Sequence, residues 1–112
     1  MIDKLVIANR GEIARRIFRT AHEMGIATVA IYADSDARAP FVHEADSAIA
    51  LQGQTSAETY LDAEKVYAAC VASGADAVHP GYGFLSENAR FAEAIMKRDI
   101  TWVGPPTHAI EQ

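Results

Sequence analysis

The chain alternates between short apolar runs and longer segments in which apolar residues recur every three or four positions. Short runs of this kind are typical of buried parallel strands, and the longer repeats are typical of helices with one buried face. The apolar runs predict five strands, at residues 4–9, 27–32, 47–51, 75–79 and 100–103. The repeats predict helices at residues 12–24, 41–45, 61–72 and 86–98. This alternation predicts an α/β three-layer, Rossmann-like domain with a mostly parallel sheet of about five strands.

The helix predicted at residues 12–24 has an apolar face and a charged face. The residues expected in the core are Ile13, Ala14, Ile17, Phe18, Ala21 and Met24. On the charged face, Arg16, Arg19 and Glu23 follow one another at spacings of three and four, which places them on one side of the helix. A solvated face with an Arg–Glu pair along the helix explains this pattern, and so does a contact between two copies of the chain. The polar segment after residue 32 predicts a loop up to Pro40.

Length and composition narrow the range of functions. The 112 residues predict one domain, spanning residues 1–112, and a net charge of −5 argues against nucleic acid as the main partner. No signal-peptide pattern occurs at the start, and no apolar run approaches the ~20 residues of a membrane span. The sequence thus favours a cytoplasmic protein that does not bind a membrane. The single cysteine, Cys70, cannot form an internal disulfide and is expected in the core.

Common nucleotide and catalytic signatures are missing or incomplete. The run Gly81-Tyr-Gly-Phe-Leu-Ser86 lacks the third glycine of a dinucleotide site, and no phosphate-binding loop ending in Gly-Lys-Ser/Thr occurs. No catalytic Ser-His-Asp arrangement or metal-ligand spacing is visible. From these patterns no residue is assigned as catalytic, cofactor-binding or metal-ligating.

The segment His79-Pro-Gly-Tyr-Gly-Phe-Leu-Ser-Glu-Asn88 is the strongest candidate for a binding loop. It lies between a predicted strand and a predicted helix, where open α/β sheets place their ligands. Pro80 favours an end to the strand at His79, and glycines on both sides of Tyr82 allow a ligand close to the backbone. A tight turn with no ligand is the alternative. We expect His79 to be a half-buried residue that fixes the conformation of the loop. A direct role in catalysis is the alternative.

Two motifs carry a resemblance to a known family. The run at residues 79–88, together with Ile7-Ala-Asn-Arg-Gly-Glu-Ile-Ala14, resembles the N-terminal (pre-ATP-grasp) domain of biotin carboxylase, the ATP-dependent component of acyl-CoA and pyruvate carboxylases. The resemblance implies a ligase that uses Mg²⁺, ATP and bicarbonate to carboxylate biotin on a carrier protein. It further implies that ATP-grasp and C-terminal domains later in the same polypeptide hold ATP and Mg²⁺. A carboxyltransferase then chooses the final acceptor.

The resemblance also implies roles for particular residues. Tyr82 and Gly83 would lie against the ureido ring of biotin, Glu87 would lie near the active-site charges, and His79 and Asn88 would support the loop. The residues that match the family's homodimer interface are Arg16, Arg19 and Glu23. On this reading the chain is a fragment of a longer enzyme and is inactive alone. The alternatives are the N-terminal domain of another ATP-grasp ligase, such as a purine-synthesis or carbamoyl-phosphate enzyme, and a non-enzymatic binding or association module.

Overall fold

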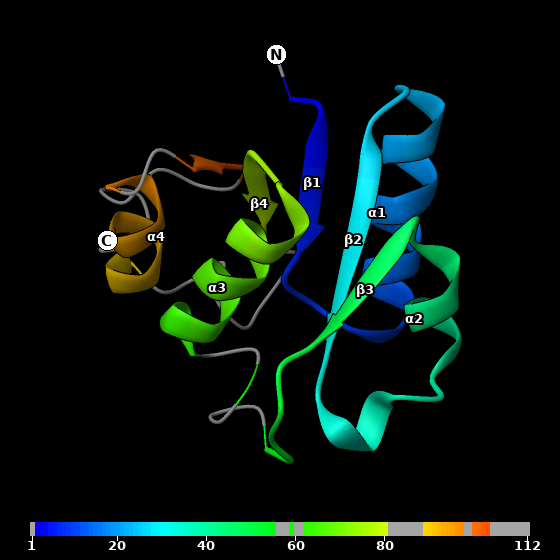
Figure 1. The fold of residues 1–112 in the computed structure, drawn as a ribbon. Helices are drawn as coiled ribbons and strands as arrows, with labels where there is room; N and C mark the ends of the chain where they lie inside the picture. The colour runs from blue at the N-terminus through cyan, green and yellow to red at the C-terminus, as the bar shows by residue number, and fades with distance from the viewer. Residues whose placement is uncertain (1, 56–58, 60–61, 81–88, 98–99, 104–112) are drawn as a thin grey trace.

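The structure, a computed structural model, describes residues 2–55, 59, 62–80, 89–97 and 100–103. In this part of the chain a single sheet contains five strands, all parallel, in the order β3-β2-β1-β4-β5 (Figure 1). The strands are β1 (Lys4–Ile7), β2 (Ala27–Tyr32), β3 (Ser47–Ala50), β4 (Ala77–His79) and β5 (Thr101–Trp102). The predicted fold class is confirmed, and most of the strands are shorter than the apolar runs that predicted them.

Helices cover both faces of the sheet. They are α1 (Gly11–Glu23), α2 (Pro40–Glu44), α3 (Ala63–Ser73) and α4 (Ala89–Met96). Helices α1 and α2 lie on one face, and α3 and α4 lie on the other (Figure 1). One prediction needs correction, because the expected loop after β2 contains a 3-10 helix, η1 (Asp34–Asp36). Its turn is closed by a hydrogen bond from the backbone N–H of Asp36 to the carbonyl of Ala33.

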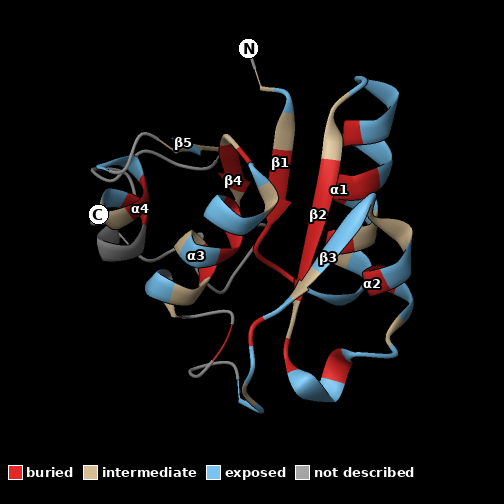
Figure 2. Cartoon of the chain, in the orientation of Figure 1, coloured by how far each residue is buried: buried red, intermediate tan, exposed pale blue. Residues whose placement is uncertain are grey.

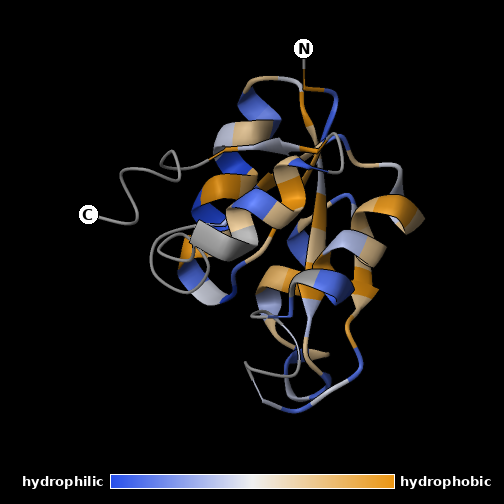
Figure 3. Cartoon of the chain, turned by 90° about the vertical axis from the view of Figure 1, so that its left-hand side faces the viewer, coloured by the Kyte–Doolittle hydropathy of each residue, from blue (hydrophilic) through white to orange (hydrophobic). Residues whose placement is uncertain are grey.

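The core consists of two layers because neighbouring residues of a strand point to opposite faces of the sheet. Val6, Val29 and Val78 pack in the layer that α3 and α4 cover. Leu5 and Ile7 pack in the layer that α1 and α2 cover. Figure 2 shows β1, β2 and β4 largely buried and β3 largely exposed at the edge of the sheet. The helices carry alternating hydrophobic and hydrophilic bands, as expected of elements with one buried face (Figure 3).

The ends of α3 follow from local chemistry. The carboxylate of Asp62 accepts hydrogen bonds from the backbone N–H groups of Glu64 and Lys65, which satisfies donors that a helix start leaves unpaired. At the other end Gly74 adopts a left-handed conformation (φ 75°) that glycine tolerates best. Gly74 thus ends α3 at Ser73, one residue after residue 72, where the sequence predicted the end of the helix.

The prediction that Met24 packs in the core is wrong. Met24 follows the last turn of α1 and is 68% exposed, whereas Ile17, Phe18 and Ala21 on the same stripe are buried. The stripe continues to Met24 in the sequence, but at this end of α1 the side chain lies on a surface groove.

Candidate functional site

The two sequence motifs meet at the carboxyl ends of β1 and β4. These strands are adjacent and parallel, with Ile7 paired with His79. One residue further on, the backbone N–H of Ala8 donates a 2.8 Å hydrogen bond to the carbonyl of His79. The side-chain amide of Asn9 then donates a 3.0 Å hydrogen bond to the carbonyl of Pro80. Ligands of open α/β sheets bind at this edge, so the arrangement places the start of the predicted binding loop where a ligand is expected.

Asn9 lies at this edge of the sheet and was not selected by the sequence analysis. Asn9 is 1% exposed and follows an unbroken run of buried apolar residues that begins at Leu5 in β1. The side-chain oxygen accepts a 2.8 Å hydrogen bond from the backbone N–H of Arg10 while the amide group reaches Pro80. The available signal was a polar side chain placed directly after a buried run and inside the first motif.

His79 is half-buried, on the face of the sheet that α1 covers. Its side chain lines a groove with a volume of about 410 Å³. The apolar residues along this groove include Leu5, Ile17, Ala21, Met24, Ile26 and Val103. Burial lowers the pKa of His79, because a partly desolvated site disfavours the charged imidazolium. The neutral ring is therefore favoured at pH values near neutrality.

The same groove is lined by Arg16, which was predicted to belong to a different surface. The structure thus brings together one residue predicted for the binding loop and one predicted for a contact between two copies. Four other predicted site residues, Tyr82, Gly83, Glu87 and Asn88, lie outside the described residues.

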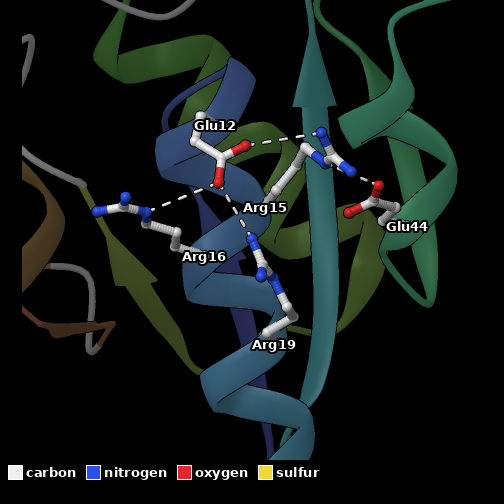
Figure 4. A network of polar contacts seen from close by, with 5 residues as sticks. All are labelled: Glu12, Arg15, Arg16, Arg19 and Glu44. Atoms are coloured by element: carbon white, nitrogen blue, oxygen red, sulfur yellow. Dashed lines mark hydrogen bonds and ion pairs between the residues drawn. The ribbon is translucent and has the colours of Figure 1, made fainter.

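The exposed face of α1 is organised around Glu12 (Figure 4). The carboxylate of Glu12 lies 3.1 Å from Nη2 of Arg19 and 3.6 Å from both Nε of Arg16 and Nη1 of Arg15. Nε of Arg15 also lies 2.8 Å from the carboxylate of Glu44 in α2. This hydrogen bond, with the charge of Glu44, raises the pKa of Arg15. The carboxylate of Glu12 thus lies within ion-pair distance of three guanidinium groups on the exposed face of α1.

Glu23 does not take part in this network. The expected pair along the helix joined an arginine to Glu23, but the arginines pair with Glu12 instead. Glu23 is exposed and forms no ion pair with any residue that the structure describes. Its carboxylate and the exposed side of Arg19 are accessible on one helix surface.

The described residues were also compared with the requirements of a metal site and of a membrane-spanning helix. Within them, no group of three or more His, Cys, Asp or Glu side chains is placed to hold a metal ion. No helix in that part of the chain is long and apolar enough to cross a membrane.

A comparison with known protein families matches nearly the whole chain. The matching family is described as the biotin carboxylase N-terminal domain, and the match covers residues 1–110. The chain belongs to this family. The family resemblance carried by the two motifs is therefore confirmed.

Curated relatives of known function share about half of the residues. Over 111 residues the chain is 53% identical to the propionyl-CoA carboxylase alpha chain of Ruegeria pomeroyi. This alignment covers 99% of this chain and 16% of that protein. The chain is 52% identical over 109 residues to the biotin-dependent acyl-coenzyme A carboxylase alpha3 subunit of Mycobacterium leprae, covering 97% of this chain and 18% of that protein. The chain therefore spans less than a fifth of the length of these relatives.

Solved structures agree with the fold. The Kluyveromyces lactis urea carboxylase superposes with a TM-score of 0.95 at 49% identity, covering 98% of this chain and 10% of that one. The Rhizobium etli pyruvate carboxylase superposes with a TM-score of 0.92 at 42% identity, covering 99% of this chain and 12% of that one. The fold of this chain therefore recurs in a urea carboxylase and in a pyruvate carboxylase.

Proposed function

We propose that this chain, residues 1–112, acts as the N-terminal domain of a biotin carboxylase. In the full protein, Mg²⁺, ATP and bicarbonate are used to carboxylate biotin on a carrier protein. The observation that carries the proposal is the family match over residues 1–110. It is supported by relatives whose names specify biotin-dependent carboxylases.

The chain contributes a wall of the biotin pocket in this proposal. Tyr82 and Gly83 contact the biotin ring, Glu87 lies near the reacting charges, and His79 and Asn88 support the loop. The argument from the described residues is the position of His79 and Pro80 at the carboxyl edge of the sheet, next to the turn that follows β1. Glycines around Tyr82 allow a ring to approach the backbone closely.

The other components of the reaction are assigned to other parts of the protein. An ATP-grasp domain holds ATP and Mg²⁺, a C-terminal domain completes the active site, and a carrier domain delivers biotin. A carboxyltransferase subunit passes the carboxyl group on to the final acceptor. The chain alone is inactive, and the full protein works in the cytoplasm.

The exposed face of α1 forms a homodimer contact in the full protein. Arg16 and Arg19 are 75% and 63% exposed, and Glu23 on the same helix is also exposed. A two-fold axis brings a patch against its own copy, so a basic and an acidic group on one patch can pair reciprocally. Glu23 suits this role because it has no ion pair among the described residues.

The pocket assignment is tested in the full-length protein by replacing Tyr82 with alanine. Formation of carboxybiotin from free biotin, ATP and bicarbonate is measured as a function of each substrate. Loss of a stacked ring is expected to raise the KM for biotin about tenfold while the KM for ATP stays within about twofold of the wild type.

The matched control is Tyr67→Ala, which removes an aromatic ring from α3 on the other face of the sheet. It is expected to lower stability without changing the KM for biotin. An unchanged biotin KM in Tyr82→Ala, or an equal rise in the control, would contradict the pocket assignment.

Calorimetric titration of the 112-residue chain separates the enzyme domain from a free-standing binding module. Neither Mg²⁺-ATP nor biotin is expected to release measurable heat with this chain alone. Micromolar binding of ATP would instead favour the free-standing module.

A further inference from the structure

One buried amide connects the two motifs of this family. Asn9 and Pro80 are separated by 71 residues in sequence and joined by a hydrogen bond. We propose that Asn9 is a positioning residue for biotin: its side chain fixes the backbone at Pro80, from which the chain continues into the predicted binding loop. The inference rests on the proposed function, because only that function gives the loop a biotin ring to bind.

Both ends of the Asn9 amide are used, which fixes its orientation. The NH₂ group donates to the carbonyl of Pro80, and the oxygen accepts from the backbone N–H of Arg10. The Pro80 carbonyl requires a hydrogen-bond donor and the Arg10 N–H requires an acceptor. A side chain that only donates, only accepts or does neither cannot serve both partners. Exchanging Asn9 for a residue without a donor would remove the buried hydrogen bond that the Pro80 carbonyl accepts from it.

The bond acts on a position with little remaining freedom. Pro80 is buried and its ring fixes φ, and the preceding carbonyl of His79 already accepts from the N–H of Ala8. A peptide group is planar, so a hydrogen bond to the Pro80 carbonyl fixes the plane from which the chain continues. Asn9 therefore restrains the direction in which the chain leaves β4.

Asn9 is also held in place through Arg10, the residue that donates to its side-chain oxygen. Arg10, whose N–H binds Asn9, forms an ion pair between its guanidinium group and the buried carboxylate of Asp36 in η1. The turn after β1 is therefore held to η1 and to Pro80 at once. Binding groups need support of this kind, because a displacement of about 1 Å is enough to lower activity strongly.

The test uses Asn9→Asp in the full-length protein, with carboxybiotin formation from free biotin as the readout. Aspartate keeps the size of asparagine and the acceptor for Arg10, but its ionised form has no proton to donate to Pro80. At about pH 8 the KM for biotin is expected to rise roughly tenfold with the KM for ATP nearly unchanged. Burial favours a protonated carboxyl group, which can donate to Pro80, so the defect is expected to shrink to about twofold near pH 6.

The controls separate positioning from stability. The wild type is measured over the same pH range, because His79 and the charged pair of Arg10 and Asp36 also lie near this edge. Thr28→Ala removes a buried hydroxyl from the start of β2, at the opposite end of the sheet, where Thr28 bonds Asp46. It is expected to lower the melting temperature without raising the KM for biotin. Asn9→Ser, which is too short to reach Pro80, provides a second variant should Asn9→Asp fail to fold, and its defect is expected not to shrink at low pH.

The outcomes are distinct for the two proposals. If Tyr82→Ala raises the KM for biotin while the Asn9 variants leave it unchanged, the positioning role is overturned and the proposed function stands. The positioning role is also overturned if Thr28→Ala raises this KM as much as the Asn9 variants do. If neither Tyr82→Ala nor the Asn9 variants change the KM for biotin, the assignment of the biotin pocket is overturned as well. A raised KM that recovers at low pH only in Asn9→Asp supports the inference.

Discussion

Lys4 and Asp76 exchange two hydrogen bonds at the edge of the sheet where β1 and β4 begin. The backbone N–H of Lys4 donates to the carboxylate of Asp76 at 3.1 Å, and the backbone N–H of Asp76 donates to the carbonyl of Lys4, also at 3.1 Å. The same carboxylate accepts from the N–H of Asp3. Partial burial disfavours the charged form, but these backbone donors outweigh it and hold the pKa of Asp76 below its usual value. One side chain thus closes the amino end of the central strand pair.

Replacing Asp76 with alanine is expected to lower the free energy of unfolding by about 1–2 kcal/mol, because two N–H groups lose their acceptor. Urea unfolding of the chain measures this change. Asp76→Asn keeps one acceptor oxygen, so its loss is expected to be smaller. An alanine variant as stable as the wild type would show that water replaces the carboxylate without cost.

The lowered pKa of Asp76 also predicts a dependence on acid. The carboxylate stabilises the fold fully above about pH 3.9, its ordinary pKa, and this contribution is lost as the pH falls through the lower pKa of the folded chain. Asp76→Asn does not titrate. The stability difference between wild type and Asp76→Asn is therefore expected to diminish in acid, and a difference that stays constant down to about pH 2 would contradict this.

Cys70 is expected to be unreactive in the folded chain. Its side chain is fully buried, and burial raises the pKa of the thiol to about 12. Because only the thiolate attacks a disulfide reagent, reaction near pH 8 is expected to be slower than that of an exposed thiol by a factor of about a thousand or more. Ellman's reagent measures this cleanly, since Cys70 is the one cysteine of the chain. Rapid labelling without denaturant, at a rate close to that in urea, would show that the α3 layer opens readily.

The sequence patterns predicted the strands and helices well because these depend on local spacing. The apolar run at residues 27–32 matches β2, and α3 ends at Ser73, one residue after the predicted end. Met24 was misplaced because a helical stripe shows which residues share a side and not how far the neighbouring layer extends. The spacing of apolar residues thus predicts a helix or strand and its buried face better than it predicts where the core ends.

The candidate site was harder to predict because it depends on pairing between distant segments. Glycine and proline chemistry made residues 79–88 a candidate binding loop, but the bond from Asn9 to Pro80 spans 71 residues and depends on β1 and β4 being neighbours. On α1, residue spacing allowed Arg19 to pair with Glu23, yet Arg19 reaches across two turns to Glu12. Side-chain partners on a charged helix face are selected by the whole cluster, which spacing alone does not describe.

His79 predicts a second effect of pH on stability. Unfolded histidine titrates near pH 6.5, whereas burial lowers the pKa of His79 in the folded chain. The stabilising contribution of the neutral ring is therefore complete above about pH 6.5 and is lost as the pH falls through the lower folded pKa. Unfolding in urea between about pH 7.5 and 5 is expected to show this loss in the wild type and less of it in His79→Gln.

The exposed His43 provides the control for this experiment. His43→Gln is expected to keep the pH dependence of the wild type. If both glutamine variants behave alike, the acid sensitivity arises elsewhere in the chain.

The charged surface of α1 predicts a specific weakening of self-association in the full-length protein. Arg19→Glu places a second acidic group beside Glu12 and, in the proposed homodimer, faces Glu23 of the opposing copy with like charge. The dimer dissociation constant, measured by sedimentation at several concentrations, is expected to rise about tenfold or more. Combining Arg19→Glu with Glu23→Arg exchanges the two charges and is expected to recover part of the affinity.

Arg38→Glu, the same change at an exposed site outside α1, serves as the control and should leave the dimer intact. A dimer unchanged by Arg19→Glu would mean that this helix face is a solvated surface on which Arg16 and Arg19 pair with Glu12 of their own chain.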